Sequence, residues 1–157
     1  MKLRSFAVAT WLAVEALLLR PAVAIESILL AEVQRLPAAL HRTFPCGRWS
    51  VGGAEGYYRV VIASVYGGVG SEMYVQRIAQ TAGGQPELTL VETVAFPELN
   101  NDHNQYSVSA ATCRGSTRSS FAELTAENEH DIGNVQRIIR IELKPPYRVT
   151  NRRVPSP

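Results

Sequence analysis

From residue 48 to residue 151 the sequence alternates apolar and polar side chains in short segments that turn-forming residues separate. A period of two residues is typical of strands with one buried face. Eight segments show the pattern, at about residues 48–52, 57–66, 71–80, 87–96, 104–113, 119–126, 134–143 and 147–151. Glycine, asparagine and proline dominate the separators. No helical segments lie between the strands to carry parallel crossovers, so we expect about eight antiparallel strands in an up-and-down barrel or a strongly curved sheet.

One segment is apolar on both faces. In residues 57–66, Tyr58 and Ile62 lie on one side of the expected strand, and Val61 and Val65 lie on the other. A strand of this kind has to be covered on both sides. We expect the concave interior of the sheet to cover one side and an N-terminal helix to cover the other.

That helix is predicted over residues 25–40, before the alternation begins. Its apolar residues recur at spacings of three and four, which is the period of an amphipathic helix. They are Ile25, Ile28, Leu29, Val33, Leu36 and Leu40. Pro37 should end or kink the helix.

Residues 1–24 have the pattern of an export signal. A positively charged start precedes an apolar run at 6–19 and a small-x-small cleavage motif at 22–24. The alternative is an uncleaved anchor, but charged residues interrupt the run, and a span needs about twenty apolar residues. We expect cleavage after residue 24, a single β-rich domain at 25–150 without a membrane span, and a disordered C-terminal tail at 151–157.

The charge balance excludes a nucleic-acid partner. Three of the 16 basic residues and one of the 14 acidic residues belong to the expected signal, which leaves 13 of each sign in the mature chain. A nucleic-acid-binding domain would carry a basic face instead. We interpret the basic residues near the C-terminus as a solvated tail.

The chain has two cysteines, Cys46 and Cys113. Paired thiols persist in the oxidising compartments that exported proteins reach, so we expect a disulfide and a periplasmic or secreted protein. The loop that such a bridge closes corresponds to a stabilisation of about 4 kcal/mol. We therefore interpret both cysteines as structural rather than catalytic.

The triplet Gly47-Arg48-Trp49 opens the first expected strand, after a short helix and before seven further strands. In this setting the triplet resembles the opening signature of the lipocalin and calycin barrels, whose tryptophan plugs the closed end. The resemblance covers three residues and a strand count. It implies a barrel that is lipocalin-like in architecture; the alternative is a tryptophan that packs in any β core.

The interior of an eight-stranded barrel either fills with side chains or holds one small ligand. Both alternatives stay open here. If there is a cavity, tyrosines suit its wall because each offers an apolar ring and one hydroxyl. The candidate ligand-binding residues are Trp49, Tyr58, Ile62, Tyr66, Met73 and Tyr106.

Three other segments have simpler structural explanations. The glycines at 67–70 precede a strand rather than a helix, so they form a turn and not a phosphate-binding loop. Residues 100–104 and 127–131 contain oxygen and imidazole ligands, but their spacing matches neither a calcium loop nor a zinc site. We therefore expect no metal and no cofactor.

No catalytic residues stand out. The Gly-x-Ser-x-Gly pentapeptide is absent, and the three histidines, His41, His103 and His130, fall in expected loops or at a helix end. We expect an exported, non-enzymatic binding protein for a small apolar or amphipathic molecule. The alternative is a secreted interaction or inhibitor module that contacts an envelope protein through its loops or a strand edge. A hydrolytic enzyme ranks third.

Overall fold

The computed structural model describes residues 34–81, 87–101, 103–116, 119–133 and 135–154. The chain divides into two units, Met1–Leu36 and Pro37–Pro157, and every strand belongs to the second. The expected signal and most of the expected helix at 25–40 lie outside the described residues. Of the remainder, residues 35–39 form bends and turns, and Leu40 already begins the first strand.

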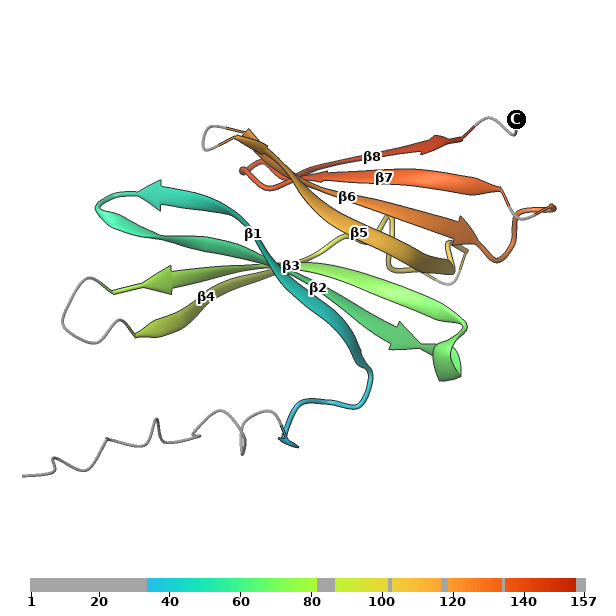
Figure 1. Ribbon diagram of the computed structural model, residues 1–157, viewed down its shortest axis with the longest axis horizontal. Helices are drawn as coiled ribbons and strands as arrows, with labels where there is room; N and C mark the ends of the chain where they lie inside the picture. Colours follow the sequence, from blue (N-terminus) through green and yellow to red (C-terminus); the bar gives the residue numbers. More distant parts are fainter. Residues whose placement is uncertain (1–33, 82–86, 102, 117–118, 134, 155–157) are drawn as a thin grey trace, which may run out of the picture. The chain divides into compact units, whose positions relative to one another are not determined.

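The second unit is built from strands (Figure 1). These are β1 (Leu40–Val51), β2 (Ala54–Val65), β3 (Gly70–Gln80), β4 (Leu88–Ala95), β5 (Tyr106–Ser116), β6 (Ser119–Asn128), β7 (Gln136–Glu142) and β8 (Arg148–Arg153), with a short 3-10 helix η1 (Tyr66–Gly68) after β2. All paired strands are antiparallel. The prediction of eight antiparallel strands is confirmed.

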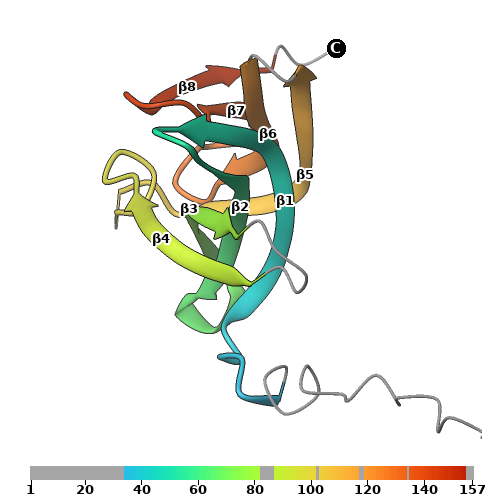
Figure 2. The same cartoon turned by 90° about the vertical axis from the view of Figure 1, so that its left-hand side faces the viewer.

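The sheet is not closed. Its order is β1-β2-β3-β5-β6-β7-β8, and β4 pairs with β3 beside this path. The first part of β3 reaches β5 through one residue pair, Ser71 with Tyr106, while Tyr74 to Gln80 pair with β4. Because β4 occupies most of the edge of β3, the sheet branches there into two halves, β1–β4 and β5–β8 (Figure 2). The closed barrel that the strand count and the Gly-x-Trp triplet allowed is therefore not formed.

Asn100 completes the backbone pairing of β3 at the branch. Its side-chain Oδ1 accepts a hydrogen bond of 2.9 Å from the Met73 amide, and its Nδ2 donates one of 2.9 Å to the Met73 carbonyl. Met73 lies between the β3 residues that pair with β5 and those that pair with β4. The asparagine-rich loop at 100–104 thus has a structural use at this position.

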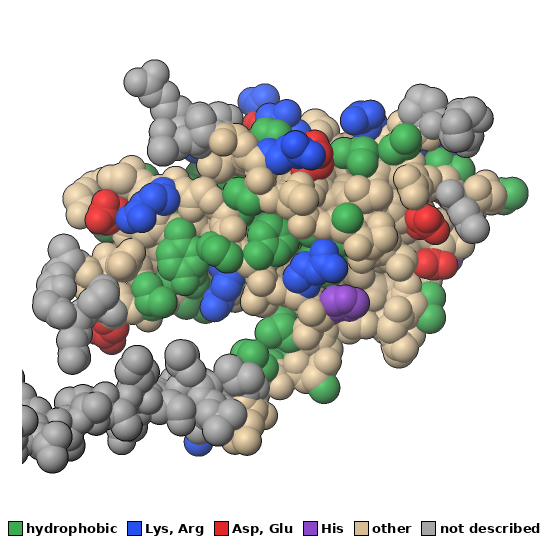
Figure 3. Space-filling model, viewed as in Figure 1, with side chains coloured by type: hydrophobic (Ala, Val, Ile, Leu, Met, Phe, Trp, Pro, Cys, Tyr) green, Lys and Arg blue, Asp and Glu red, His purple; other side chains and the backbone are tan. Residues whose placement is uncertain are grey.

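The two halves share one hydrophobic core. Alternate residues of β2 and β3 (Tyr58, Val60, Ile62, Met73 and Val75) and of β6 and β7 (Ala122, Leu124, Ala126, Ile139 and Ile141) are buried in the same cluster. Successive side chains of a strand point to opposite faces, so each strand presents one row to the core. The opposite face of the β1–β4 half is not uniformly polar. On the face that Figure 3 shows, hydrophobic side chains gather over β1 to β3 with basic ones between them.

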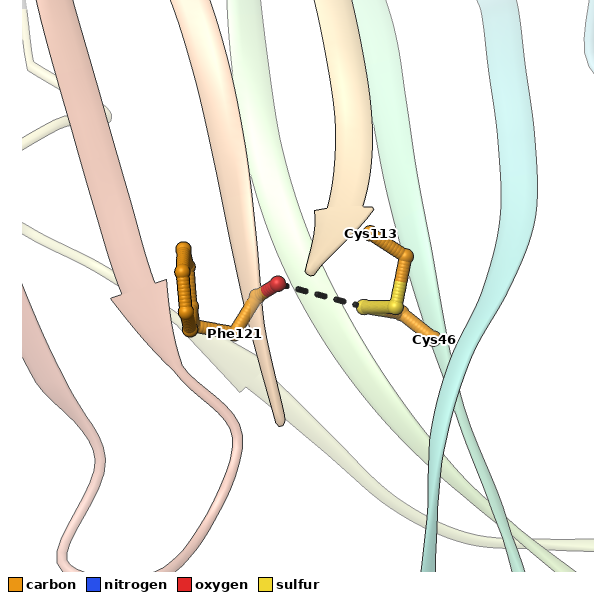
Figure 4. Close-up of a disulfide and its surroundings, with 3 residues drawn as sticks. All are labelled: Cys46, Cys113 and Phe121. Atoms are coloured by element: carbon orange, nitrogen blue, oxygen red, sulfur yellow. Dashed lines mark hydrogen bonds between the residues drawn. A yellow bond between two sulfur atoms is a disulfide. The ribbon is translucent and has the colours of Figure 1, made fainter. Parts of the chain in front are cut away.

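A disulfide between Cys46 on β1 and Cys113 on β5 links the halves, with a Cα–Cα distance of 5.2 Å. The predicted bridge is confirmed, and it indicates a non-reducing compartment. Figure 4 shows the bridge next to β6, where the Sγ atom of Cys46 lies 3.5 Å from the carbonyl oxygen of Phe121. Gly47 follows with φ +74°, and a Cβ atom there would lie 2.3 Å from the Oγ atom of Ser120. Glycine therefore lets β1 approach β6 closely.

The end of the chain differs from the expected tail. Residues 151–153 form the last part of β8, where Asn151, Arg152 and Arg153 pair with Ile139, Ile138 and Arg137. Residues 155–157 lie outside the described residues. Within the described part of the chain, no helix is long and apolar enough to cross a membrane.

Candidate ligand-binding cleft

A cleft of about 750 Å³ opens between the two halves, at the end that carries the β1–β2 hairpin. Residues 48–51 of β1, Tyr58 of β2 and Arg77 of β3 form one wall. Ser120 of β6 and residues 143–145, between β7 and β8, form the other. The cleft volume is in the usual range for small-molecule sites, which is about 300–1,000 Å³.

Trp49 is fixed in the wall by its indole nitrogen. Its Nε1 donates to the carbonyl oxygens of Tyr57 and Ile78, both at 3.2 Å, so the side chain reaches across β2 to β3. Its register partner is Gly56, where a Cβ atom would lie 1.9 Å from the Ile78 carbonyl oxygen. Because the N–H group is satisfied within the protein, the indole offers a ligand only its apolar ring.

The guanidinium of Arg77 lies over this ring, with Cζ 5.1 Å from the ring centroid. Cations are attracted to the face of an indole. The Nε atom of Arg77 is 3.7 Å from Oε2 of Glu92, beyond hydrogen-bonding distance. This Nε atom is buried, and among the described residues nothing accepts a hydrogen bond from it. Arg77 therefore lines the cleft without a hydrogen-bonded internal partner at this atom.

Tyr58 in the cleft wall contacts Tyr147, which is not itself a lining residue. The rings of Tyr58 and Tyr147 meet edge to face, with centroids 6.4 Å apart and an interplanar angle of 87°. The hydroxyl of Tyr147 donates to Oε2 of Glu92 at 3.1 Å. Burial, and then the hydrogen bond to Glu92, raise the pKa of Tyr147 to about 12. Burial also raises the pKa of Tyr58, against the opposing effect of Arg77. Both phenols are thus protonated at neutral pH and can donate hydrogen bonds.

The six ligand-binding candidates from the sequence do not stay together. Trp49 and Tyr58 line the cleft. Ile62, Met73 and Tyr106 lie in the shared core, each at most 2% exposed. Tyr66 is 55% exposed on η1, after the last residue of β2, so it reaches neither the cleft nor the core.

Sequence reasoning missed the basic residues of the cleft. Lys144 was assigned to a solvated basic tail, and Arg48 was treated only as the middle residue of the Gly-x-Trp triplet, because exposed basic residues near turns are common. Arg77 did carry a signal. It continues the inward-facing row of Met73 and Val75 at a spacing of two, and a charged residue in such a row is unusual.

No protein-family model, curated protein or solved structure matches this chain. The cleft is therefore the feature from which we infer a function. Its lining contains three hydroxyl side chains, Ser50, Tyr58 and Ser120, and none of the described lining residues is a histidine or a carboxylate. Elsewhere among the described residues, no three His, Cys, Asp or Glu side chains gather closely enough to hold a metal.

Proposed function

We propose that this protein is an exported, non-enzymatic binding protein that holds a small amphipathic molecule in the cleft between its two sheet halves. The observation that carries the proposal is a roomy cleft, about 750 Å³, with the rings of Trp49 and Tyr58 in its wall. A largely apolar concave site with a few polar groups is the usual form of a small-molecule site.

Binding would follow from burial of the ligand's apolar part against these rings. Each square ångström of apolar surface removed from water contributes about 25 cal/mol. The hydroxyls of Tyr58 and Ser50 offer hydrogen bonds that orient a polar end, since both belong to the lining. The contact between Tyr58 and Tyr147 helps to hold the Tyr58 ring in one geometry before the ligand arrives.

The composition of the lining favours binding over hydrolysis. A serine nucleophile needs a base within hydrogen-bonding reach. The lining offers serines with basic residues, and its described members include no imidazole or carboxylate to take a proton from them. A bound molecule would be held rather than cleaved.

Isothermal titration calorimetry with a panel of amphiphiles, used as monomers, tests the proposal. We expect at least one to bind with a stoichiometry of one. The variant Ser50→Tyr, which places a ring in the cleft, should weaken that binding about tenfold or more. Thr43→Tyr adds the same ring at an exposed site on β1 outside the lining and should leave binding unchanged. Absence of binding across the panel, or equal binding by both variants, would overturn the proposal.

A strand edge supports a second candidate function, recognition of another envelope protein. Within the described residues β4 pairs only with β3, and its Leu88, Leu90 and Val91 are each about half exposed. Edge strands are usually protected by charges or proline. β8, also an edge, carries Arg148, Arg152 and Arg153, whereas the first four residues of β4 carry no charge. An extended segment of a partner could add to this edge.

A pull-down from envelope extract tests this candidate. One stoichiometric protein should be recovered by the unaltered chain and lost with Leu90→Lys, which places a charge on the β4 edge. Thr150→Lys adds the same charge to the β8 edge and should have no effect. Recovery of the same protein by the Leu90→Lys variant would exclude the β4 edge as its site.

A further inference from the structure

The charged side chains of the cleft are all of one sign. Arg48 on β1, Arg77 on β3 and Lys144 after β7 line it, and the described lining includes no carboxylate. The carboxylate of Glu92 lies beside Arg77, but Glu92 is not part of the lining. If the negative charge of Glu92 balances the positive charge of Arg77, the cleft keeps a net charge of +2, from Arg48 and Lys144. In contrast, basic and acidic residues are nearly balanced over the whole chain, at 16 and 14.

We infer that the ligand is an anionic amphiphile, whose carboxylate group is bound by Arg77 and attracted by Arg48 and Lys144. This inference rests on the proposed function and adds to it the chemical class of the ligand. The apolar body of such a molecule lies against Trp49 and Tyr58, and its head group lies toward the basic side chains.

Arg77 is suited to hold the head group because it is positioned in advance. Its guanidinium lies over the Trp49 ring, and its side chain is only 25% exposed. A side chain that is already ordered loses little entropy when it binds. Guanidinium has five N–H donors in a fixed fork that matches the two oxygens of a carboxylate.

Glu92 does not satisfy this fork. Its Oε2 is 3.7 Å from Nε of Arg77, and the same oxygen accepts the hydrogen bond of Tyr147 at 3.1 Å. Tyr147 thus holds Glu92 where it balances the charge of Arg77 without taking up its Nε donor. Because Nε itself is shielded from solvent, a ligand carboxylate in the cleft approaches the terminal nitrogens of the guanidinium.

Arg48 and Lys144 are exposed and come from opposite halves of the sheet. Charges at such positions attract an anion over a distance limited by salt screening. They contribute less than Arg77 to the bound complex, because water surrounds them.

A matched pair of ligands tests the inference. Dodecanoate and dodecan-1-ol have the same chain length and differ in the charge of the head group. Calorimetry at pH 7 on the full chain should show that dodecanoate binds at least about tenfold more tightly, as expected for hydrogen bonds to a charged group. Added salt should weaken dodecanoate binding and leave dodecanol binding unchanged. Equal binding of the acid and the alcohol would overturn the inference and leave the proposed function standing. If neither binds, the inference is overturned, and the proposed function then depends on the other amphiphiles of the panel.

Charge-removing variants show which basic residue binds the carboxylate. Arg77→Gln should weaken dodecanoate binding about tenfold or more and leave dodecanol binding unchanged, while Arg152→Gln, an exposed change of equal charge on β8, should alter neither. Near-ultraviolet circular dichroism shows whether the Arg77→Gln variant keeps its fold. If it does not, Lys144→Gln and Arg48→Gln, both at exposed positions, should each weaken dodecanoate binding severalfold. Equal weakening of the acid and the alcohol by these variants would contradict the inference.

Discussion

The hydroxyl of Tyr147 donates a hydrogen bond of 3.1 Å to Oε2 of Glu92, 55 residues earlier in the chain. This bond connects the loop between β7 and β8 to β4, which belongs to the other half of the sheet. The ring of Tyr147 also meets that of Tyr58 edge to face. Contacts from both halves therefore meet at Tyr58, which lies in the cleft wall.

Removal of the hydroxyl in Tyr147→Phe should lower the free energy of unfolding by about 1 kcal/mol, the usual net value of one hydrogen bond. The ring stays in place, so contact with Tyr58 should persist. Urea denaturation of the oxidised protein measures the difference. A variant as stable as the unaltered protein would show that the bond contributes nothing.

The same residue should make stability depend on pH at the alkaline end. The pKa of Tyr147 rises from 10.0 to about 12 on folding, so the folded state favours the protonated phenol. Its contribution is complete below pH 10 and is lost as the pH rises through 12. Urea midpoints measured across this interval should fall less steeply for Tyr147→Phe than for the unaltered protein. Identical slopes would contradict the assignment.

The disulfide should control the cleft as well as overall stability. Cys46 precedes the lining residues Arg48 and Trp49 on β1, and its bridge to Cys113 holds this strand against the other half. We expect reduction to cost about 4 kcal/mol in unfolding free energy. It should also change the emission of Trp49, measured in a Trp11→Phe background where Trp49 is the sole tryptophan. A double variant, Cys46→Ser with Cys113→Ser, should not respond to the reductant.

Gly56 should tolerate no side chain. A Cβ atom there would lie 1.9 Å from the carbonyl oxygen of Ile78, which also accepts the indole N–H of Trp49. Gly56→Ala should therefore push β2 from β3 and destabilise the protein by about 1–3 kcal/mol. Gly52→Asn is the control, because φ there is +60° with no atom within 4 Å, and asparagine adopts this conformation readily. Equal denaturation midpoints for the two variants would contradict the close approach.

Asn100 should protect the backbone of Met73 from solvent exchange. Its side chain binds both the amide and the carbonyl of Met73 at 2.9 Å. In Asn100→Ala we expect much faster hydrogen exchange at the Met73 amide, whereas the amide of Val75, which lies within the β3 pairing, should be unaffected. Unchanged protection of the Met73 amide would show that a group other than Asn100 accepts its hydrogen bond.

The period of two residues was enough to predict the strands, because each of them buries one row of side chains in the core. β1 was the exception. The helical spacing extends to Leu40, but long-range pairing with β2, such as Leu40 with Ala63 and Thr43 with Val61, makes this segment a strand. A local pattern does not contain that information.

Whether the sheet closes depends on which of β4 and β5 pairs along β3, and the alternation of apolar and polar residues does not contain this information. β4 and β5 have similar alternation, and either could pair along β3. The structure gives most of that edge to β4 and one residue pair to β5. The alternation also does not tell how far along a strand a cavity extends, so the prediction assigned Tyr58 and Tyr66, on one face of the same expected strand, to a single cavity. Tyr58 lies in the first half of β2, whereas Tyr66 follows its last residue on η1, and only Tyr58 reaches the cleft.

The most direct test of ligand binding at Trp49 is contact quenching. In a chain with Trp11→Phe, Trp49 is the only fluorophore of its kind. A dodecanoate brominated next to its carboxylate quenches an indole only when it lies close to the ring, and the guanidinium of Arg77, which holds that carboxylate, lies over the Trp49 ring. The account predicts saturable quenching with one site per chain, weakened by Arg77→Gln. Quenching that rises linearly without saturation, as for free tryptophan, would contradict a ligand held in this cleft.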